Sequence, residues 1–353
     1  MSRGLGDVYK RQPVAPLLDG IAYDQNDPYN RMCPEYAKGS RSAVGCAATA
    51  MAQIMRYYRY PERGKGSHAY TPEFYPSMGR IEVDFSESAY DWDNMPPTFG
   101  PDAGEEQCAA VARLMYDAGV AVSMNYGPMS GALSEDWPAA LVDHFSYDDA
   151  VTLRFRSNYG LDDWEKVVRT EIDNGRPVYV TGFTEEGGHA FVFDGYDESG
   201  LIHVNWGWSG MSNGYFDTTF LTPSTQGTGG STGGFNSRQM MVTGIMPECG
   251  AQETVTLVSE EGLSEVKGSD GSSVRLNGKI YNVGWRDVVA DFTLLLSDCE
   301  GNAVREFPGP EEITVGRETP HRNLLFDGLD FDGVADGTYR MDVVASAHGA
   351  SVR

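Results

Sequence analysis

The sequence predicts an α+β domain over residues 13–248, followed by an all-β sandwich of immunoglobulin-like size over residues 249–353. Four stretches up to residue 175 carry apolar residues at helical spacing, and runs rich in β-branched and aromatic residues follow them. From about residue 249 no helical pattern remains, and short strand-like runs alternate with turn residues. A chain of 353 residues is long enough for two domains of ordinary size.

The composition narrows the classes of function. Hydrophobic residues make up 41% of the chain, which supports a packed core rather than wholesale disorder. The formal net charge is −24, so we expect no nucleic-acid partner, because phosphate binding needs a basic face. No run of about 18 apolar residues occurs, so we also expect no membrane span.

The five cysteines do not suggest a metal site. Their number is odd, so at least one thiol is unpaired or pairs between chains. The chain has neither a CxxC nor an HExxH motif, and we expect no metal and no other cofactor. A disulfide between Cys249 and Cys299 is one arrangement that the sequence leaves open.

The first twelve residues, MSRGLGDVYKRQ, stand apart from the predicted domains. The string DVYKRQ is what the transposon mosaic end used in sequencing libraries encodes in frame. We therefore interpret residues 1–12 as a library artefact, the alternative being a genuine disordered start. The stretch lacks the basic and apolar regions of a signal peptide, and we expect the natural N-terminus, with any such signal, to be missing here.

The first predicted helix begins at Cys46 and ends before Pro61. It reads CAATAMAQIMRYYRY, and apolar or small residues lie nearly all round it, which is typical of a buried helix. Helical spacing recurs at residues 104–120, at 134–145 with Ser134 as a candidate N-cap, and at 161–175 with Gly175 as the stop.

Strand-like runs complete the first domain and make up the second. In the first domain they cover residues 177–183, 189–197, 201–208 and 238–247. Turn residues join the middle two into a hairpin, and the loop PSTQGTGGSTGGFN precedes the last. In the second domain they cover residues 254–259, 272–283, 288–298, 312–316 and 337–346. No Cys…Trp…Cys framework supports true immunoglobulin kinship there.

Cys46 is either a reactive thiol or a small packing residue. A thiol at a helix N-terminus lies at the positive end of the helix dipole, which favours the thiolate. Gly45 lets the chain turn sharply before it, and the alanines after it allow close approach of other elements. Most free cysteines, however, are simply buried apolar residues, and this stretch alone does not decide between the two.

His189 favours the reactive alternative. It follows Gly187 and Gly188 at the start of a predicted hairpin, where the glycines let a substrate backbone approach. The return strand carries Asn205 and Trp206, either of which is a candidate to fix the imidazole tautomer. A two-residue turn pairs Trp206 with Phe191, which puts Trp206 on the sheet face of His189 and turns Asn205 away. A bulge of one residue would instead turn Asn205 toward His189, so spacing leaves the choice open.

Several motifs are similar to those of one peptidase family. GCAATAMAQIMRYYRYP, GGHAFVFDGYD, HVNWGWSGMSNGYFD and GTGGSTGGFN with GIMP, in this order, resemble the streptopain family of papain-like cysteine peptidases. Upstream, VAPLLDGIAYDQNDPYN resembles the mature N-terminus of that family. The resemblance covers residues 13–248 and implies a papain-like domain in which a central N-terminal helix packs on an antiparallel sheet.

The resemblance also implies roles for particular residues. It makes Cys46 the nucleophile and His189 the general base, with Gln25 sharing the oxyanion hole with the backbone N–H of Cys46. The Asn205-Trp206 pair matches the pair beside the histidine in the family. The implied substrate contacts are Ser130, Gly131, Ala132 and Gly188. Family members often have serine where Ala132 stands.

The implied activity is that of a secreted cysteine endopeptidase that hydrolyses proteins or peptides through a thioester acyl-enzyme. The family also implies an inhibitory propeptide, which is absent from this chain. The alternative from another class is an inactive peptidase-like protein for surface binding or adhesion, suggested by the second domain. A further alternative keeps the Cys–His chemistry but uses it for amide transfer or cell-wall peptide cleavage. The second domain itself is expected either to position the enzyme on a surface or to act as a spacer.

Overall fold

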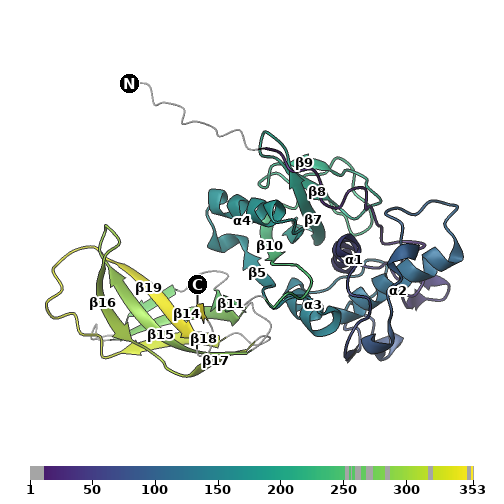
Figure 1. Ribbon diagram of the computed structural model, residues 1–353. Coiled ribbons are helices and arrows are strands. Elements are labelled where there is room, and N and C mark those ends of the chain that lie inside the picture. Colours follow the sequence, from purple (N-terminus) through teal and green to yellow (C-terminus); the bar gives the residue numbers. More distant parts are fainter. Residues whose placement is uncertain are drawn as a thin grey trace. The chain divides into compact units, whose positions relative to one another are not determined.

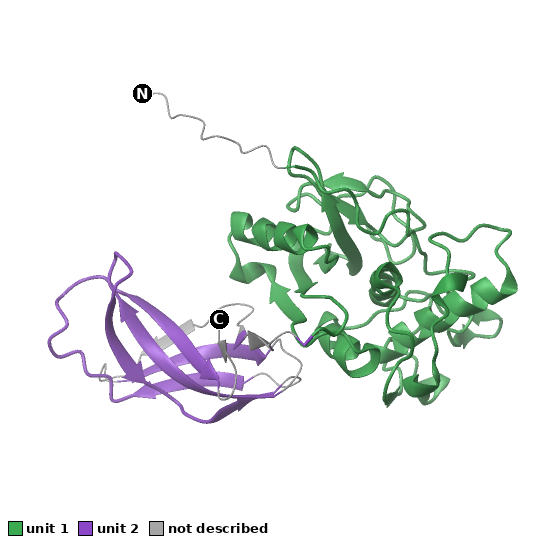
Figure 2. Ribbon diagram, in the orientation of Figure 1, with its two compact units in different colours: residues 1–249 green, residues 250–353 purple. Residues whose placement is uncertain are grey.

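The structure is a computed structural model that describes residues 12–250, 254–255, 257–258, 264–267, 273–282, 287–316, 321–347 and 351–352. Residues 1–11, which belong to the segment interpreted as an artefact, lie outside these ranges. The chain divides into two compact units, Met1–Cys249 and Gly250–Arg353 (Figure 2). Each unit is built around its own hydrophobic core.

A six-stranded antiparallel sheet is the frame of the first unit (Figure 1). Its two longest strands, β7 and β10, are rich in aromatic, β-branched and methionine side chains, which suits a buried sheet. In spatial order the strands are β5 (Thr152–Phe155), β10 (Ser237–Thr243), β6 (Val178–Phe183), β7 (Gly188–Tyr196), β8 (Ile202–Asn205) and β9 (Gly214–Phe216).

The four predicted helices are confirmed with small shifts at their ends. They are α1 (Cys46–Tyr58), α2 (Glu105–Ala121), α3 (Trp137–Phe145) and α4 (Leu161–Asp173). Two short hairpins accompany them, β1 (Glu35–Ala37) with β2 (Ser40–Arg41) and β3 (Ser67–Tyr70) with β4 (Ile81–Asp84). The mixture of helices and an antiparallel sheet agrees with the predicted α+β class.

Helix α1 is the buried centre of the first unit. Its residues from Ala47 to Met55 are all buried, and the helix contacts both α2 and β7. Arg59 adopts the left-handed conformation that ends a helix, and Pro61 follows it. Cys46 is the first residue of α1, the helix that contacts β7.

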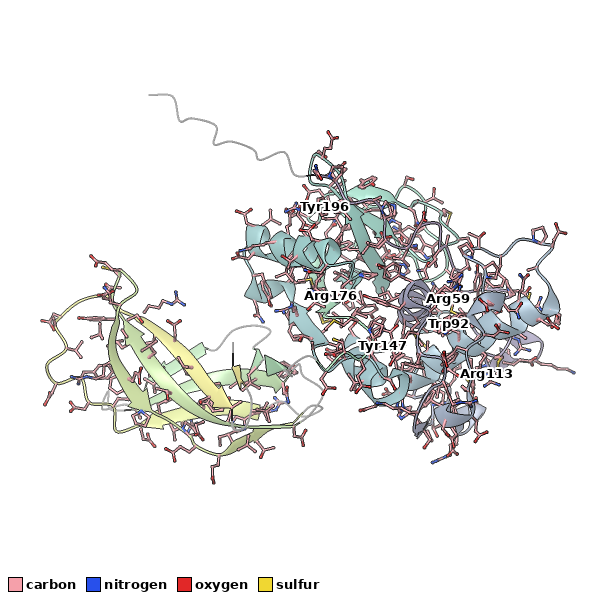
Figure 3. All side chains as sticks on the ribbon, viewed as in Figure 1. Arg59, Trp92, Arg113, Tyr147, Arg176 and Tyr196 are labelled. Atoms are coloured by element: carbon pink, nitrogen blue, oxygen red, sulfur yellow. The ribbon has the colours of Figure 1, made fainter. Side chains whose placement is uncertain are left out.

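The opposite face of the sheet is covered by α4 and an aromatic cluster. Trp164, Val168 and Ile172 of α4 pack with Phe191 and Phe193 of β7. The same cluster contains Trp206, Trp208 and Phe235, from the segments that follow β8 and precede β10. At the end of α4, Arg176 pairs with Glu171 at 2.7 Å (Figure 3). The aromatic cluster, which includes Trp206, Trp208 and Phe235, fixes the positions of the loops that surround His189.

The second unit consists of two antiparallel sheets that share one apolar core. Alternate residues of β15 point into that core, which is the expected pattern for a half-buried strand. One sheet joins β14 (Ser273–Asn282) to β12 (Leu257–Val258), β13 (Ser264–Lys267) and β18 (His321–Asp327). The other joins β15 (Val288–Ser297) to β16 (Ala303–Pro308), β17 (Ile313–Val315) and β19 (Arg340–Ala347). A parallel pair of β11 (Thr254–Val255) and β20 (Ser351–Val352) completes it. An immunoglobulin-like relationship remains a prediction.

Several local expectations differ from the structure. The strands β5, β16 and β18 were not predicted, because they are short or carry polar residues on an exposed face. Ser134 does not cap α3, since the N-cap is Asp136 and Ser134 lies in the 3₁₀ turn before it. Its hydroxyl instead donates to Thr181 Oγ1 at 3.3 Å. The described residues contain no disulfide, and Cys249 and Cys299, whose pairing the sequence left open, belong to different units.

Candidate active site

The residue before the candidate nucleophile has to be glycine. Gly45 has a φ of 94°, and a Cβ on it would come within 2.6 Å of the Met124 side chain. The chain therefore turns into α1 with the loop that begins at Met124 packed directly against it. Cys46 follows at the tip of the buried helix, where it is half-buried.

The Cys46 thiol is subject to opposing influences. Burial raises the pKa of the Cys46 thiol, while the backbone N–H groups of Ala190, Ala47 and Cys46 itself act to lower this pKa. Desolvation outweighs the three donors, so the helix N-terminus does not by itself produce a resting thiolate. The hydrogen bond from the backbone N–H of Ala190, the residue after His189, places the thiol at the start of β7.

The His189 imidazole is held in one tautomer. It is buried, and its Nε2 lies 2.9 Å from the carbonyl oxygen of Trp206. A carbonyl oxygen only accepts, so Nε2 must carry the proton and the Nδ1 of a neutral ring must have a free lone pair. Nδ1 is buried and has no hydrogen-bond partner among the residues that the structure describes. A buried nitrogen with a free lone pair is what a general base requires.

Aromatic rings fix the plane of this imidazole. The Trp208 ring stacks on it with centroids 4.5 Å apart, and the Phe235 ring lies 5.3 Å away. These rings exclude water, and burial lowers the pKa of His189 to about 4. With the pKa of the Cys46 thiol raised, both groups are neutral at pH 7 in the resting site.

The structure distinguishes between the two candidate orienting residues. Val192 pairs with Asn205, so the Asn205 side chain lies on the sheet face opposite that of His189. A bulge does occur between Phe193 and Gly195, but it lies too far toward the turn to change this pairing. The Asn205 amide therefore points away from the imidazole and bonds Ile21 O and Gly207 N instead. Trp206 is the direct partner of the imidazole, through its backbone carbonyl rather than its indole.

Gln25 lies at the same centre. Its backbone carbonyl accepts from Val44 N at 2.9 Å, and its side-chain Nε2 donates to Thr228 O at 2.7 Å. A Cβ on Gly229 would be 3.7 Å from Gln25 Nε2 and 3.8 Å from His189 Nδ1. The glycine-rich loop thus passes beside both side chains, and one N–H of the Gln25 amide is not used by Thr228.

The four candidate substrate contacts differ in how accessible they are to a substrate. The Ser130 hydroxyl is buried, donates to Ala43 O at 2.7 Å and accepts from Gly127 N at 3.0 Å, so it fixes the protein rather than a substrate. Gly131 has open space where a side chain would stand, and Ala132 is half-buried. Gly188 is exposed, and a Cβ there would come within 2.6 Å of the Phe183 ring.

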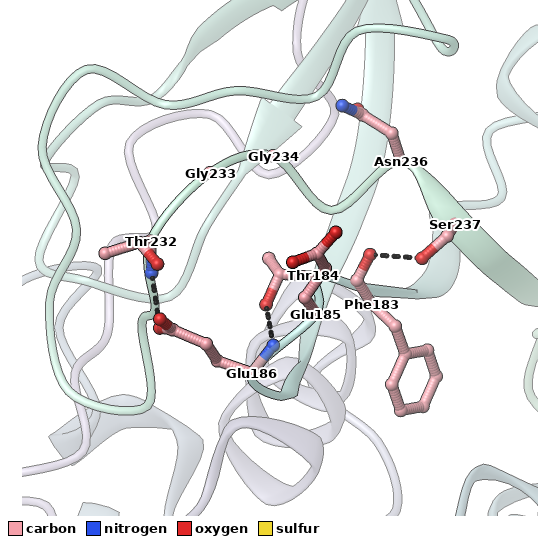
Figure 4. Close-up of a pocket in the computed structure, with 9 residues that line it drawn as sticks. All are labelled: Phe183, Thr184, Glu185, Glu186, Thr232, Gly233, Gly234, Asn236 and Ser237. Atoms are coloured by element: carbon pink, nitrogen blue, oxygen red, sulfur yellow. Dashed lines mark hydrogen bonds between the residues drawn. The ribbon is translucent and has the colours of Figure 1, made fainter.

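A pocket of about 500 Å³ adjoins Gly188 (Figure 4). It lies between the turn that joins β6 to β7 and the end of the glycine-rich loop. The Glu186 carboxylate accepts from Thr232 N at 3.1 Å, and Ser237 Oγ donates to Phe183 O at 2.7 Å. These two bonds hold the loop against the turn. The lining residues are Phe183, Thr184, Glu185, Glu186, Thr232, Gly233, Gly234, Asn236 and Ser237.

Sequence reasoning missed two residues of this site. Trp208 stacks on His189, and its Nε1 donates to Thr228 O at 2.9 Å, the carbonyl that also accepts from Gln25. Thr228 O thereby links the base to the amide donor. The Trp-Gly-Trp sequence was a visible signal for Trp208, whereas a backbone carbonyl such as that of Thr228 leaves no signal in a sequence.

His189 is expected to make the folded first unit sensitive to acid. Its pKa is about 4 in the native state and near 6.5 when unfolded, so between these values only the unfolded chain binds the proton. Its contribution to stability is complete above about pH 6.5, and about 3 kcal/mol is lost as the pH falls to about 4. Urea unfolding of wild type and His189→Gln at pH 7 and pH 4 measures this difference. Equal losses in the two proteins would contradict the lowered pKa.

The part of the chain that the structure describes contains neither a metal site nor a membrane-spanning helix. In those residues, no three His, Cys, Asp or Glu side chains gather as a metal site requires. None of the helices described there has both the length and the apolar character needed to span a bilayer.

The comparisons with known proteins concern the unit that carries this site. The model of the peptidase C10 family matches residues 23–216. Streptopain of Streptococcus pyogenes is 40% identical over 259 residues, which are 69% of this chain and 65% of streptopain. The thiol protease/hemagglutinin PrtT of Porphyromonas gingivalis is 36% identical over 242 residues, which are 66% of this chain and 28% of PrtT. The chain thus spans 65% of the length of the streptopains it matches.

The solved structures give the same result. The active wild-type interpain A cysteine protease of Prevotella intermedia superposes with a TM-score of 0.60 at 38% identity. The match covers 66% of this chain and 94% of interpain A. Together with the family match, these similarities identify the chain as a member of the peptidase C10 family, the streptopain family of cysteine peptidases.

Proposed function

We propose that this chain is a cysteine endopeptidase that hydrolyses peptide bonds with Cys46 as nucleophile and His189 as general base. The observation that carries the proposal is the buried, unpartnered Nδ1 of His189, whose tautomer is set by Trp206 O. Family membership adds support for the reaction class. Retention of Gln25 in the same centre speaks against an inactive binding protein, because adhesion needs no oxyanion donor.

Attack begins from a neutral pair. Because burial raises the pKa of Cys46 and lowers that of His189, the thiol proton moves to Nδ1 as the sulfur approaches the substrate carbonyl. The resulting imidazolium keeps its Nε2–H bond to Trp206 O. A thiolate–imidazolium pair thus forms during the reaction.

The oxyanion is stabilised by two donors. The N–H of Cys46 belongs to the first turn of α1, where backbone N–H groups have no partner within the helix. The second donor is the Gln25 N–H that Thr228 does not use. His189 next protonates the leaving amine, and water then hydrolyses the thioester with His189 as base.

The proposal also covers the path of the substrate, the location of the protein and the roles of its two domains. Residues 13–248 form the peptidase domain, and the polypeptide substrate crosses between the Ser130–Ala132 backbone and Gly188. The protein is secreted or at the cell surface, and a propeptide blocks the site before maturation. Residues 249–353 form a separate immunoglobulin-like domain that positions the enzyme or acts as a spacer.

A peptidyl fluoromethyl ketone tests the function, because it reacts with an activated thiol in a peptide-binding site. We expect one label per chain, confined to Cys46, and a parallel loss of casein hydrolysis. Cys249 and Cys299 are exposed and serve as internal controls for ordinary thiol reactivity. Equal labelling of these two and Cys46, read by peptide mass mapping, would support the inactive binding protein instead.

A further inference from the structure

We propose that Asn205 is a positioning residue for the segment that carries the oxyanion donor Gln25. The inference rests on the proposed peptidase function and assigns the Asn205 side chain a place in it. Asn205 is buried, with both ends of its amide bonded to backbone. Neither bond reaches the imidazole.

The amide joins two segments that are far apart in sequence. Its Nδ2 donates to Ile21 O at 2.7 Å, and its Oδ1 accepts from Gly207 N at 3.1 Å. Ile21 is only four residues before Gln25, while Gly207 follows the residue whose carbonyl holds His189. Asn205 thereby ties the segment of the amide donor to the turn that carries the partner of the base.

Other contacts carry this link from Ile21 toward Gln25. Ser209 N donates to Tyr23 O at 3.0 Å, and Ser209 Oγ donates to the Asp24 carboxylate at 3.2 Å. The same carboxylate accepts from Gln25 N at 2.6 Å. Residues 205–209 therefore contact residues 21–25 at several points, and the bond from Asn205 to Ile21 O is the first of these contacts.

Both bonds are specific to asparagine. Leucine has a similar volume but neither donates nor accepts, so the buried Ile21 carbonyl would lose its Asn205 donor. Aspartate keeps an acceptor for Gly207 N but presents a carboxylate to the Ile21 carbonyl. In either variant the segment that carries Gln25 loses its anchor at Ile21 O. Aspartate keeps the acceptor for Gly207 N, which belongs to the same peptide group as the Trp206 carbonyl that holds His189, whereas leucine removes it.

A double-mutant cycle tests the inference on the whole chain, with peptide hydrolysis as the readout. Gln25→Ala should lower kcat by about 100- to 1,000-fold. Asn205→Asp, which keeps the acceptor for Gly207 N and loses only the donor to Ile21 O, should lower kcat by about 10- to 100-fold with KM changed less than threefold, because a displaced oxyanion donor acts on the transition state. In the Gln25→Ala background, Asn205→Asp should cost less than about threefold in kcat, because the group it positions is already gone.

A matched control uses a second asparagine of the same region. Asn213 Oδ1 accepts from Trp206 N at 3.0 Å, so Asn213→Leu should disturb the partner of His189 and keep its full effect in the Gln25→Ala background. A full loss from Asn205→Asp in that background, or a shift of the low-pH limb of kcat/KM in Asn205→Asp alone, would overturn the inference. If Asn205→Asp does not fold, Asn205→Ser, whose hydroxyl can still accept from Gly207 N, takes its place with the same expected outcomes. Absence of alkylation-sensitive hydrolysis in the wild type would instead refute the proposed function, and the inference with it.

Discussion

Cys46→Ala is expected to lower kcat/KM for peptide hydrolysis by at least about 10⁴-fold while leaving the fold intact. Alanine keeps the Cβ and suits a helix whose next residues are also small, so the packing of α1 should not change. No other thiol can replace it in the site, because Cys33 and Cys108 are buried elsewhere. Casein cleavage and circular dichroism of the purified variant measure the two effects.

Cys299→Ala is the matched control for this prediction. Its thiol is exposed and lies in the second unit, so hydrolysis should stay within about twofold of wild type. Hydrolysis by Cys46→Ala at more than about 1% of the wild-type rate would contradict the assignment of the nucleophile.

His189→Gln is expected to lower kcat by about 10³- to 10⁴-fold with little change in KM. The glutamine amide can still donate to Trp206 O, but it has no basic lone pair to take the thiol proton. The loss should therefore lie in the chemical step rather than in substrate binding. Steady-state kinetics on a fluorogenic peptide gives kcat and KM separately.

His203→Gln provides the comparison, because it changes a second histidine of the same hairpin outside the site. His203 Nδ1 lies 2.6 Å from Asp194 Oδ1, so the variant loses a structural pair and should keep kcat within about threefold. Similar losses in the two variants would show that hairpin packing, rather than a base at His189, governs the rate.

Much of the fold followed from local patterns. The run of small and apolar residues after Cys46 predicted a buried helix, and α1 is buried through Met55. The aromatic and β-branched runs around His189 predicted a hairpin, and β7 pairs with β8 as expected. Short strands such as β5 and β16 escaped prediction, because their stability comes from neighbours distant in sequence.

The identities of Cys46, His189 and Gln25 as candidates needed only the sequence, because reactive side chains stand in motifs that a reader can see. Their protonation states and hydrogen-bond partners, in contrast, depend on the tertiary structure. Burial reverses the expected preference of Cys46 for a resting thiolate, and rings from three separate segments surround His189. The choice between Asn205 and Trp206 depended on strand register and on a main-chain carbonyl, which is the same in every residue type and therefore leaves no mark in the sequence.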